Sequence, residues 1–131
     1  MRSSVLHYYF AGMTVGIILL QAAIVAPTLA KTLSREDFGT SIRVLWPKFF
    51  LMVTATGVAC LASMLFGGQW AVSQVVIAAL TACFALACYL IIPATNRATD
   101  TGNHQKFQRL HVTSVALTVA MLAINISFLF V

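Results

Sequence analysis

The chain has 131 residues, of which 60% are hydrophobic and 8% are charged, and its formal net charge at pH 7 is +5. A soluble domain carries about 25% charged residues, so this composition excludes an ordinary soluble globular protein. The positive charge does not indicate nucleic-acid binding, because short loops between membrane helices offer no element that reads a groove.

Three long segments carry no formal charge, namely residues 5–30, 49–96 and 110–131. A helix needs about 20 apolar residues to cross the hydrocarbon core of a bilayer. The segments therefore predict one, two and one crossings. We expect an all-α membrane protein with four transmembrane helices in an antiparallel up-down bundle. It forms a single domain over residues 1–131, with helices at about 5–29, 47–66, 70–92 and 107–131.

The first expected helix has polar residues at seven-residue steps, which place them on one line along its surface. They are His7, Thr14, Gln21 and Thr28. Gly12 and Gly16 form a G-x-x-x-G motif on another side of the helix. The motif predicts close packing against a neighbouring helix or self-association.

The segment between the first two helices has its own helical pattern. Ser34 and Asp37 have the spacing of a capping box, and apolar residues recur at helical spacing over residues 38–45. This predicts a short amphipathic helix on the inner membrane surface. Pro47 suits a first helical turn and is expected to begin the second membrane helix.

The last two helices also carry lines of polar residues. We expect the third helix to stop at Pro93 and the fourth to begin near Phe107. Hydrocarbon cannot satisfy polar groups, so the lines should face one another inside the bundle. They are Gln74, Thr81, Cys88 and Thr95 in the third helix, His111, Ser114, Thr118 and Asn125 in the fourth, and a weaker line of Thr56, Cys60 and Ser63 in the second.

These lines have two interpretations, which are helix packing and a hydrated path or ligand slot along the bundle axis. Gln21 and Asn125 favour the second, because an amide needs a partner inside the membrane. The expected intramembrane polar set is Gln21, Thr81, Thr118 and Asn125.

Seven of the eight cations lie in residues 31–48 and 97–109, which alternating helices place on the same face of the membrane. Short loops rich in Lys and Arg stay cytoplasmic. We therefore predict a bacterial inner-membrane protein with both basic loops in the cytoplasm and both termini outside.

Polar residues at these inner helix ends predict a vestibule. Its expected members are Arg35, Asn96, Arg97, Asp100, Arg109, His111 and Ser114. Asp100 is expected to be solvated or to pair with Arg97, Arg109 or Arg35. The chain contains no nucleotide-binding loop and no nucleophile with a matching base, so we expect no enzyme.

No cofactor is expected, although a haem or a thiophilic metal stays open as an alternative. His7 and His111 lie at opposite membrane faces and could not hold one ion together, whereas His104 and His111 lie at the same end. The three cysteines, Cys60, Cys83 and Cys88, show no ligand spacing.

Four stretches of the chain resemble the transmembrane protein 205-like family. They are "PTLAKTLSREDFG", "WPKFF", "PATNRATD" and "FQRLHVTSVAL". The resemblance implies a four-helix membrane domain of unknown function and little about mechanism. The family often has Asn seven residues after the His that corresponds to His111, where this chain has Thr118.

The leading interpretation is a non-enzymatic membrane protein that self-associates or is an accessory subunit of a larger membrane complex. Its expected partners are membrane lipids and other membrane subunits or itself. The first alternative is a carrier of a small molecule or metal compound that uses the inner vestibule. The haem or metal protein is the second alternative.

Overall fold

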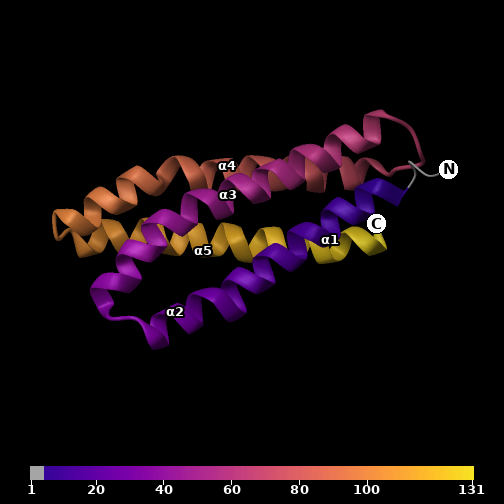
Figure 1. Ribbon diagram of the computed structural model, residues 1–131. Helices are drawn as coiled ribbons and strands as arrows, with labels where there is room; N and C mark the ends of the chain where they lie inside the picture. The colour runs from indigo at the N-terminus through magenta and orange to yellow at the C-terminus, as the bar shows by residue number, and fades with distance from the viewer. Residues whose placement is uncertain (1–4) are drawn as a thin grey trace.

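The computed structural model describes residues 5–131, which are almost entirely helical (Figure 1). The first span, Leu6–Thr32, consists of α1 (Leu6–Leu19), the π-helical segment η2 (Leu20–Val25) and α2 (Ala26–Thr32). The others are α3 (Arg35–Leu65), α4 (Val72–Asp100) and α5 (His104–Ser127), and α5 ends in the short 3₁₀ segment η3 (Phe128–Phe130). All four spans are long and apolar enough to cross a membrane. The predicted all-α membrane fold is confirmed.

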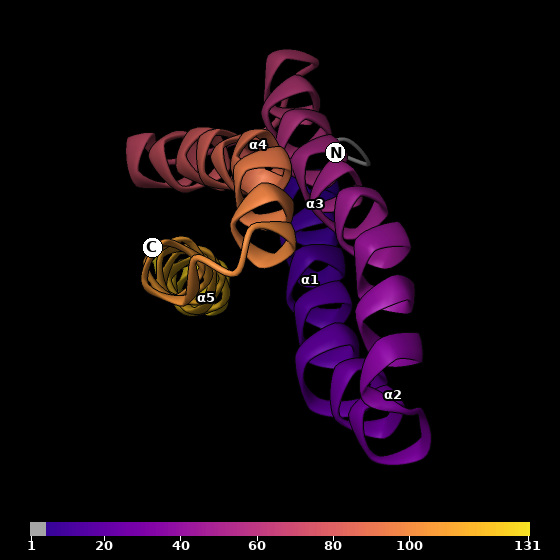
Figure 2. The same ribbon diagram turned by 90° about the vertical axis from the view of Figure 1, so that its left-hand side faces the viewer.

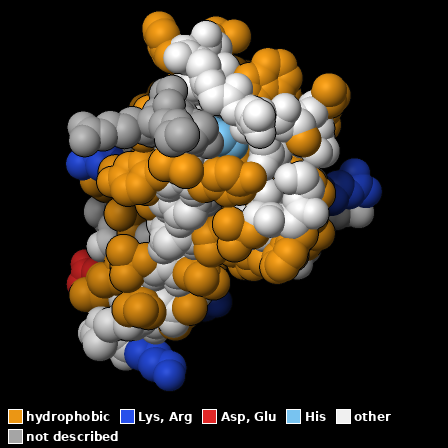
Figure 3. Space-filling view, turned by 90° about the vertical axis from the view of Figure 1, so that its right-hand side faces the viewer, with side chains coloured by type: hydrophobic (Ala, Val, Ile, Leu, Met, Phe, Trp, Pro, Cys, Tyr) orange, Lys and Arg blue, Asp and Glu red, His pale blue; other side chains and the backbone are white. Residues whose placement is uncertain are grey.

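The spans run up and down, and α3 packs against both α1 and α4. The α2–α3 junction and the α4–α5 turn lie at one end of the molecule (Figure 1). We call this the basic end, because residues 31–48 and 97–109 lie there. The start of α1, the C-terminus and the α3–α4 turn lie at the other end. Seen from there, the surface shows mainly hydrophobic and uncharged side chains (Figure 3).

The polar lines on α3 and α4 face the interior of the bundle, as predicted. Gln74, Thr81, Cys88 and Thr95 are all buried, so the line on α4 is covered over its whole length. The weaker line on α3, which consists of Thr56, Cys60 and Ser63, is buried as well. Many apolar side chains point outward instead, which suits a surface in contact with lipid rather than water.

Helices α3 and α4 lie very close together at Gly57. A Cβ atom at Gly57 would lie 2.9 Å from the backbone nitrogen of Ala82 and 3.2 Å from its Cα. Small residues allow membrane helices to come this near, because lipid provides no hydrophobic force that drives them together. The absence of a side chain at Gly57 thus sets the spacing of this helix pair.

The expected amphipathic helix is not a separate element. Ser34 caps a helix as predicted, since its Oγ accepts a hydrogen bond from the backbone N–H of Asp37 at 3.1 Å. However, that helix is α3, which continues through Pro47 to Leu65. Proline removes only one backbone hydrogen bond, and the carbonyl freed by Pro47 belongs to the exposed Arg43.

The predicted ends of the last two helices also shift. Helix α4 passes through Pro93 and ends at Asp100, because membrane helices tolerate proline where other groups satisfy the freed carbonyl. Helix α5 begins at His104 rather than near Phe107. Its N-cap is Asn103, whose side chain accepts a hydrogen bond from the N–H of Lys106 at 3.1 Å.

The π-helical segment η2 interrupts the polar line of the first span. His7 and Thr14 are buried, Gln21 is half-buried and Thr28 is exposed. A π-helical turn contains more residues than an α-helical turn, so the residues that follow η2 are rotated relative to α1. The predicted seven-residue line therefore faces the interior only as far as Gln21.

Candidate ligand-binding site

Polar side chains in the half of the bundle far from the basic end join the helices to one another. The hydroxyls of Thr14 and Thr56 are 2.7 Å apart, which connects α1 to α3. Asn125 Nδ2 donates to Thr81 Oγ1 and to the carbonyl of Met121, both at 2.8 Å. Hence Asn125 and Thr81, two of the four predicted intramembrane polar residues, connect α5 to α4.

Gln74 also connects separate parts of the chain in this half of the bundle. The sequence predicts it only as a member of a polar line. Its Nε2 donates to the hydroxyl of Tyr8 at 3.0 Å and to the carbonyl of Val131 at 3.3 Å. Its Oε1 accepts from the backbone N–H of Ala71 at 3.0 Å. The amide in the polar line was the available signal, but the partners of its Nε2, Tyr8 and Val131, lie on distant parts of the chain.

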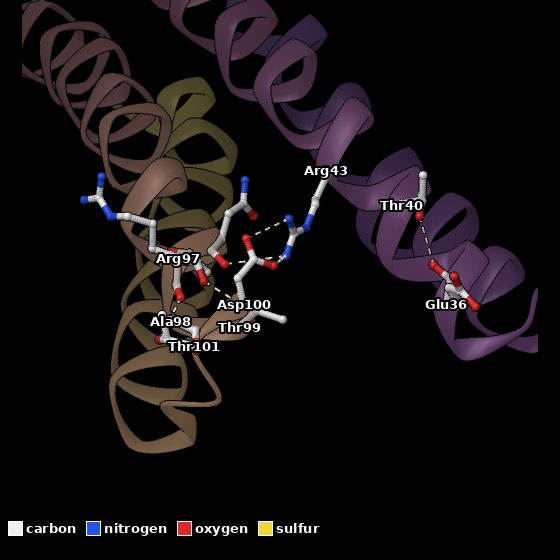
Figure 4. A network of polar contacts seen from close by, with 10 residues as sticks. Glu36, Thr40, Arg43, Arg97, Ala98, Thr99, Asp100 and Thr101 are labelled. Carbon is white, nitrogen blue, oxygen red and sulfur yellow. Dashed lines mark hydrogen bonds and ion pairs between the residues drawn. The ribbon is translucent and has the colours of Figure 1, made fainter.

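At the basic end, Asp100 forms an ion pair with Arg43 (Figure 4). The sequence predicts a solvated Asp100 or a pair with Arg97, Arg109 or Arg35, so the predicted partners are wrong. Arg43 donates from both terminal nitrogens to the carboxylate, with Nη1 3.2 Å from Oδ2. The continuous α3 brings Arg43 beside the end of α4. Both side chains are exposed, so water and salt screen the attraction and the pair contributes little to stability.

The predicted vestibule does not form as one cavity. Arg97 points away from the Arg43–Asp100 pair (Figure 4). Arg35 and Arg109 are exposed, and Asn96 takes part through its carbonyl, which lies 3.5 Å from Arg43 Nη2. His111 and Ser114, the remaining members, line a different cavity deeper in the bundle.

This cavity, which we call the lateral pocket, has a volume of about 230 Å³ and lies between the first and last spans. Its lining residues come from three parts of the fold. They are Gln21, Ala22 and Ala26 from η2 and α2, Trp46, Phe49 and Phe50 from α3, and His111, Ser114, Val115, Thr118 and Val119 from α5.

The lateral pocket forms where the first span leaves α5. Helix α1 packs against α5, but α2 contacts mainly η2 and α3. Figures 1 and 2 both show α2 extending away from α5. Among the residues described, none in η2 or α2 is buried. The divergence leaves the lateral pocket beside the part of α5 that carries His111 and Ser114.

Two nitrogens of the lining side chains are buried without a hydrogen-bond partner within residues 5–131. They are Nε2 of Gln21 and Nδ1 of His111. Buried polar groups are nearly always paired, so each of these nitrogens requires a physical explanation. Thr118 is different, because its hydroxyl donates to the carbonyl of Ser114 at 2.7 Å.

His111 is held by aromatic stacking. Its ring lies 5.9 Å from the indole of Trp46 at 13° and 5.6 Å from the ring of Phe107 at 7°. His104 is exposed at the start of α5. Over the described part of the chain, no three His, Cys, Asp or Glu side chains gather where they could hold one metal ion.

Gly12 and Gly16 are exposed on α1. A Cβ atom at either position would meet nothing within 4 Å in the described part of the chain. The motif therefore does not serve close packing between helices of this chain. Its other interpretation is contact with a second chain.

A family model described as a domain of unknown function (DUF4149) matches residues 9–104. The match includes three spans and the η2, α2 and α3 sides of the lateral pocket, whereas nearly all of α5 lies beyond it. Comparisons with curated proteins and with solved structures found no match. Since the matched region covers most of the chain and the fold has four apolar spans, this is a small integral membrane protein that belongs to the DUF4149 family.

Proposed function

We propose that this protein is a non-catalytic binding protein for a small lipid-soluble molecule that enters the lateral pocket from the bilayer. The observation that carries the proposal is the pairing of an apolar cavity with two unpartnered nitrogens, on Gln21 and His111, within the described chain. We therefore assign the small-molecule interpretation to the lateral pocket and not to the predicted vestibule.

The energetics of the membrane support a ligand. A polar group without a partner costs several kcal/mol in hydrocarbon, about 2–7 kcal/mol by transfer measurements. A ligand with one polar group and an apolar body would satisfy these nitrogens and fill the cavity. The eleven lining residues include no carboxylate and no cysteine beside His111, which favours binding over catalysis.

The test is to purify the protein from native membranes in mild detergent and identify the retained small molecules by mass spectrometry. We expect wild-type protein to retain a specific lipophile, and Gln21→Leu to retain about tenfold less, since a net hydrogen bond of about 1.4 kcal/mol is lost. Thr28→Leu, an exposed position on the same span, is the matched control. Equal retention by all three proteins would rule out the proposal.

We also propose that the basic end faces the cytoplasm of a bacterium and that both termini lie outside. The positive-inside rule supports this orientation, because the cations of residues 31–48 and 97–109 share one end. A reporter that is active only outside the inner membrane should be active when it is fused to the C-terminus of this protein.

The relation to the transmembrane protein 205-like family stays a prediction that rests on the four resembling stretches.

Self-association, or a role as an accessory subunit, is a second candidate. Gly12 and Gly16 favour it, because they leave a shallow, uncovered strip on the outside of α1. We expect Gly16→Leu to reduce the cross-linked dimer in native membranes severalfold, since a bulky side chain keeps two α1 helices apart. Ala87→Leu, at an exposed position of α4, should leave the dimer intact. A wild-type protein that never cross-links to itself would eliminate self-association.

A further inference from the structure

The aromatic side chains give the lateral pocket a preferred ligand shape. The rings of His111 and Trp46 are nearly parallel, at 13°, and Phe49 and Phe50 extend the aromatic wall on α3. Aromatic rings attract one another in offset-stacked or edge-to-face arrangements. A flat ring could therefore stack beside His111 and Trp46, whereas a branched or saturated body would lose this attraction.

The polar groups indicate an uncharged hydrogen-bond acceptor. Gln21 Nε2 is a donor, and a neutral His111 carries one N–H group. Gln21 lines the cavity, and its Nε2 has no hydrogen-bond partner within the described chain. The lining contains neither Lys nor Arg, so a carboxylate or phosphate would be buried without a counter-charge. A carbonyl oxygen fits these conditions.

The size of the pocket indicates that it holds only part of the ligand. Its volume of about 230 Å³ is below the roughly 300–1,000 Å³ of pockets for drug-sized molecules. Ala22, Val115 and Val119 line it and are exposed on the outer surface of the bundle. A hydrocarbon tail attached to the bound group could therefore leave the pocket and remain among the lipids.

We infer that the lateral pocket binds the head group of a quinone-type lipid, that is, a flat conjugated ring with carbonyl oxygens and an apolar tail. The ring stacks beside Trp46 and His111, and a carbonyl accepts a hydrogen bond from Gln21. This inference rests on the proposed binding function and specifies the chemical class of its ligand.

The two tryptophans of the chain provide the test. Trp46 lines the lateral pocket, whereas Trp70 lies in the α3–α4 turn at the other end. The full-length Trp70→Phe protein in nanodiscs is titrated with decylubiquinone, whose ring quenches indole emission on contact. We expect saturable quenching of Trp46. The Trp46→Phe protein, which retains only Trp70, should show shallow and linear quenching.

Two comparisons identify the group that is recognised. Gln21→Leu in the Trp70→Phe background should raise the apparent Kd about tenfold, and Thr28→Leu should leave it unchanged. Decylbenzene has the same tail and a flat ring without carbonyls. It should displace the quinone only at concentrations at least about tenfold higher, because it cannot accept a hydrogen bond from the amide.

The outcomes separate the two proposals. If decylbenzene displaces the quinone with an apparent Kd equal to that of decylubiquinone, a site for lipophiles exists but its specificity for quinones is overturned. If quenching is linear and equal in the two single-tryptophan proteins, the quinone does not bind in the pocket and the ligand class fails, whereas the binding function fails only if the retention of small molecules is also equal in the wild-type, Gln21→Leu and Thr28→Leu proteins.

Discussion

Replacing Gly57 with alanine is expected to destabilise the protein by about 1–3 kcal/mol, the usual cost of forcing an extra carbon into a packed interior. The added Cβ would lie 2.9 Å from the backbone nitrogen of Ala82. Backbone atoms cannot rotate away as a flexible side chain can. Helices α3 and α4 must therefore separate, which weakens the most extensive helix contact in the bundle.

The measurement is the free energy of unfolding in mixed micelles with increasing SDS. Gly39→Ala is the matched control, because Gly39 lies on the same helix and a Cβ there meets nothing within 4 Å in the described residues. That variant should be neutral or up to about 1 kcal/mol more stable, since alanine favours a helix over glycine. Equal stabilities for the two variants would mean that α3 and α4 are not as close as 2.9 Å implies.

Replacing Ala26 with phenylalanine is expected to abolish ligand retention while the protein stays folded. Ala26 lines the lateral pocket at the start of α2, and the new ring would occupy the cavity in place of a ligand. Because the pocket is already open, the ring enters space and not packed side chains. We expect at least about tenfold weaker retention, and stability equal to or above that of the wild-type protein.

Mass spectrometry of the retained molecules and thermal unfolding in detergent check this prediction together. Ala30→Phe is the control, because it adds the same side chain one turn further along α2 at an exposed position. It should retain the ligand. If Ala26→Phe retains as much ligand as Ala30→Phe, the molecule binds somewhere other than the lateral pocket.

The four spans and the inward polar lines could be predicted from sequence because both follow from local rules. A charge-free segment of sufficient length must cross the bilayer as a helix, and its polar residues must avoid lipid. The line Gln74, Thr81, Cys88 and Thr95 shows this well, since all four side chains are buried. Helical spacing alone placed them on one face.

The helix boundaries at prolines were predicted wrongly for a reason that is also physical. The prediction treats proline as a stop or start signal, because a proline inside a helix removes one backbone hydrogen bond. In this protein Pro47 and Pro93 lie inside α3 and α4. Because α3 begins at Arg35 and not at Pro47, it brings Arg43 beside Asp100. The error in this helix boundary therefore also led to the wrong ion-pair partner.

The sequence by itself determined the membrane class, the number of spans, the shared basic end and the inward face of the polar lines on α3 and α4, because solvation acts on each segment separately. Only the tertiary structure decided which polar groups find partners. Asn125 meets Thr81 across two helices, whereas Gln21, on the π-helical turn before α2 diverges, meets none within the described chain. Such pairings depend on the relative rotation and spacing of helices distant in sequence, and that geometry creates the lateral pocket.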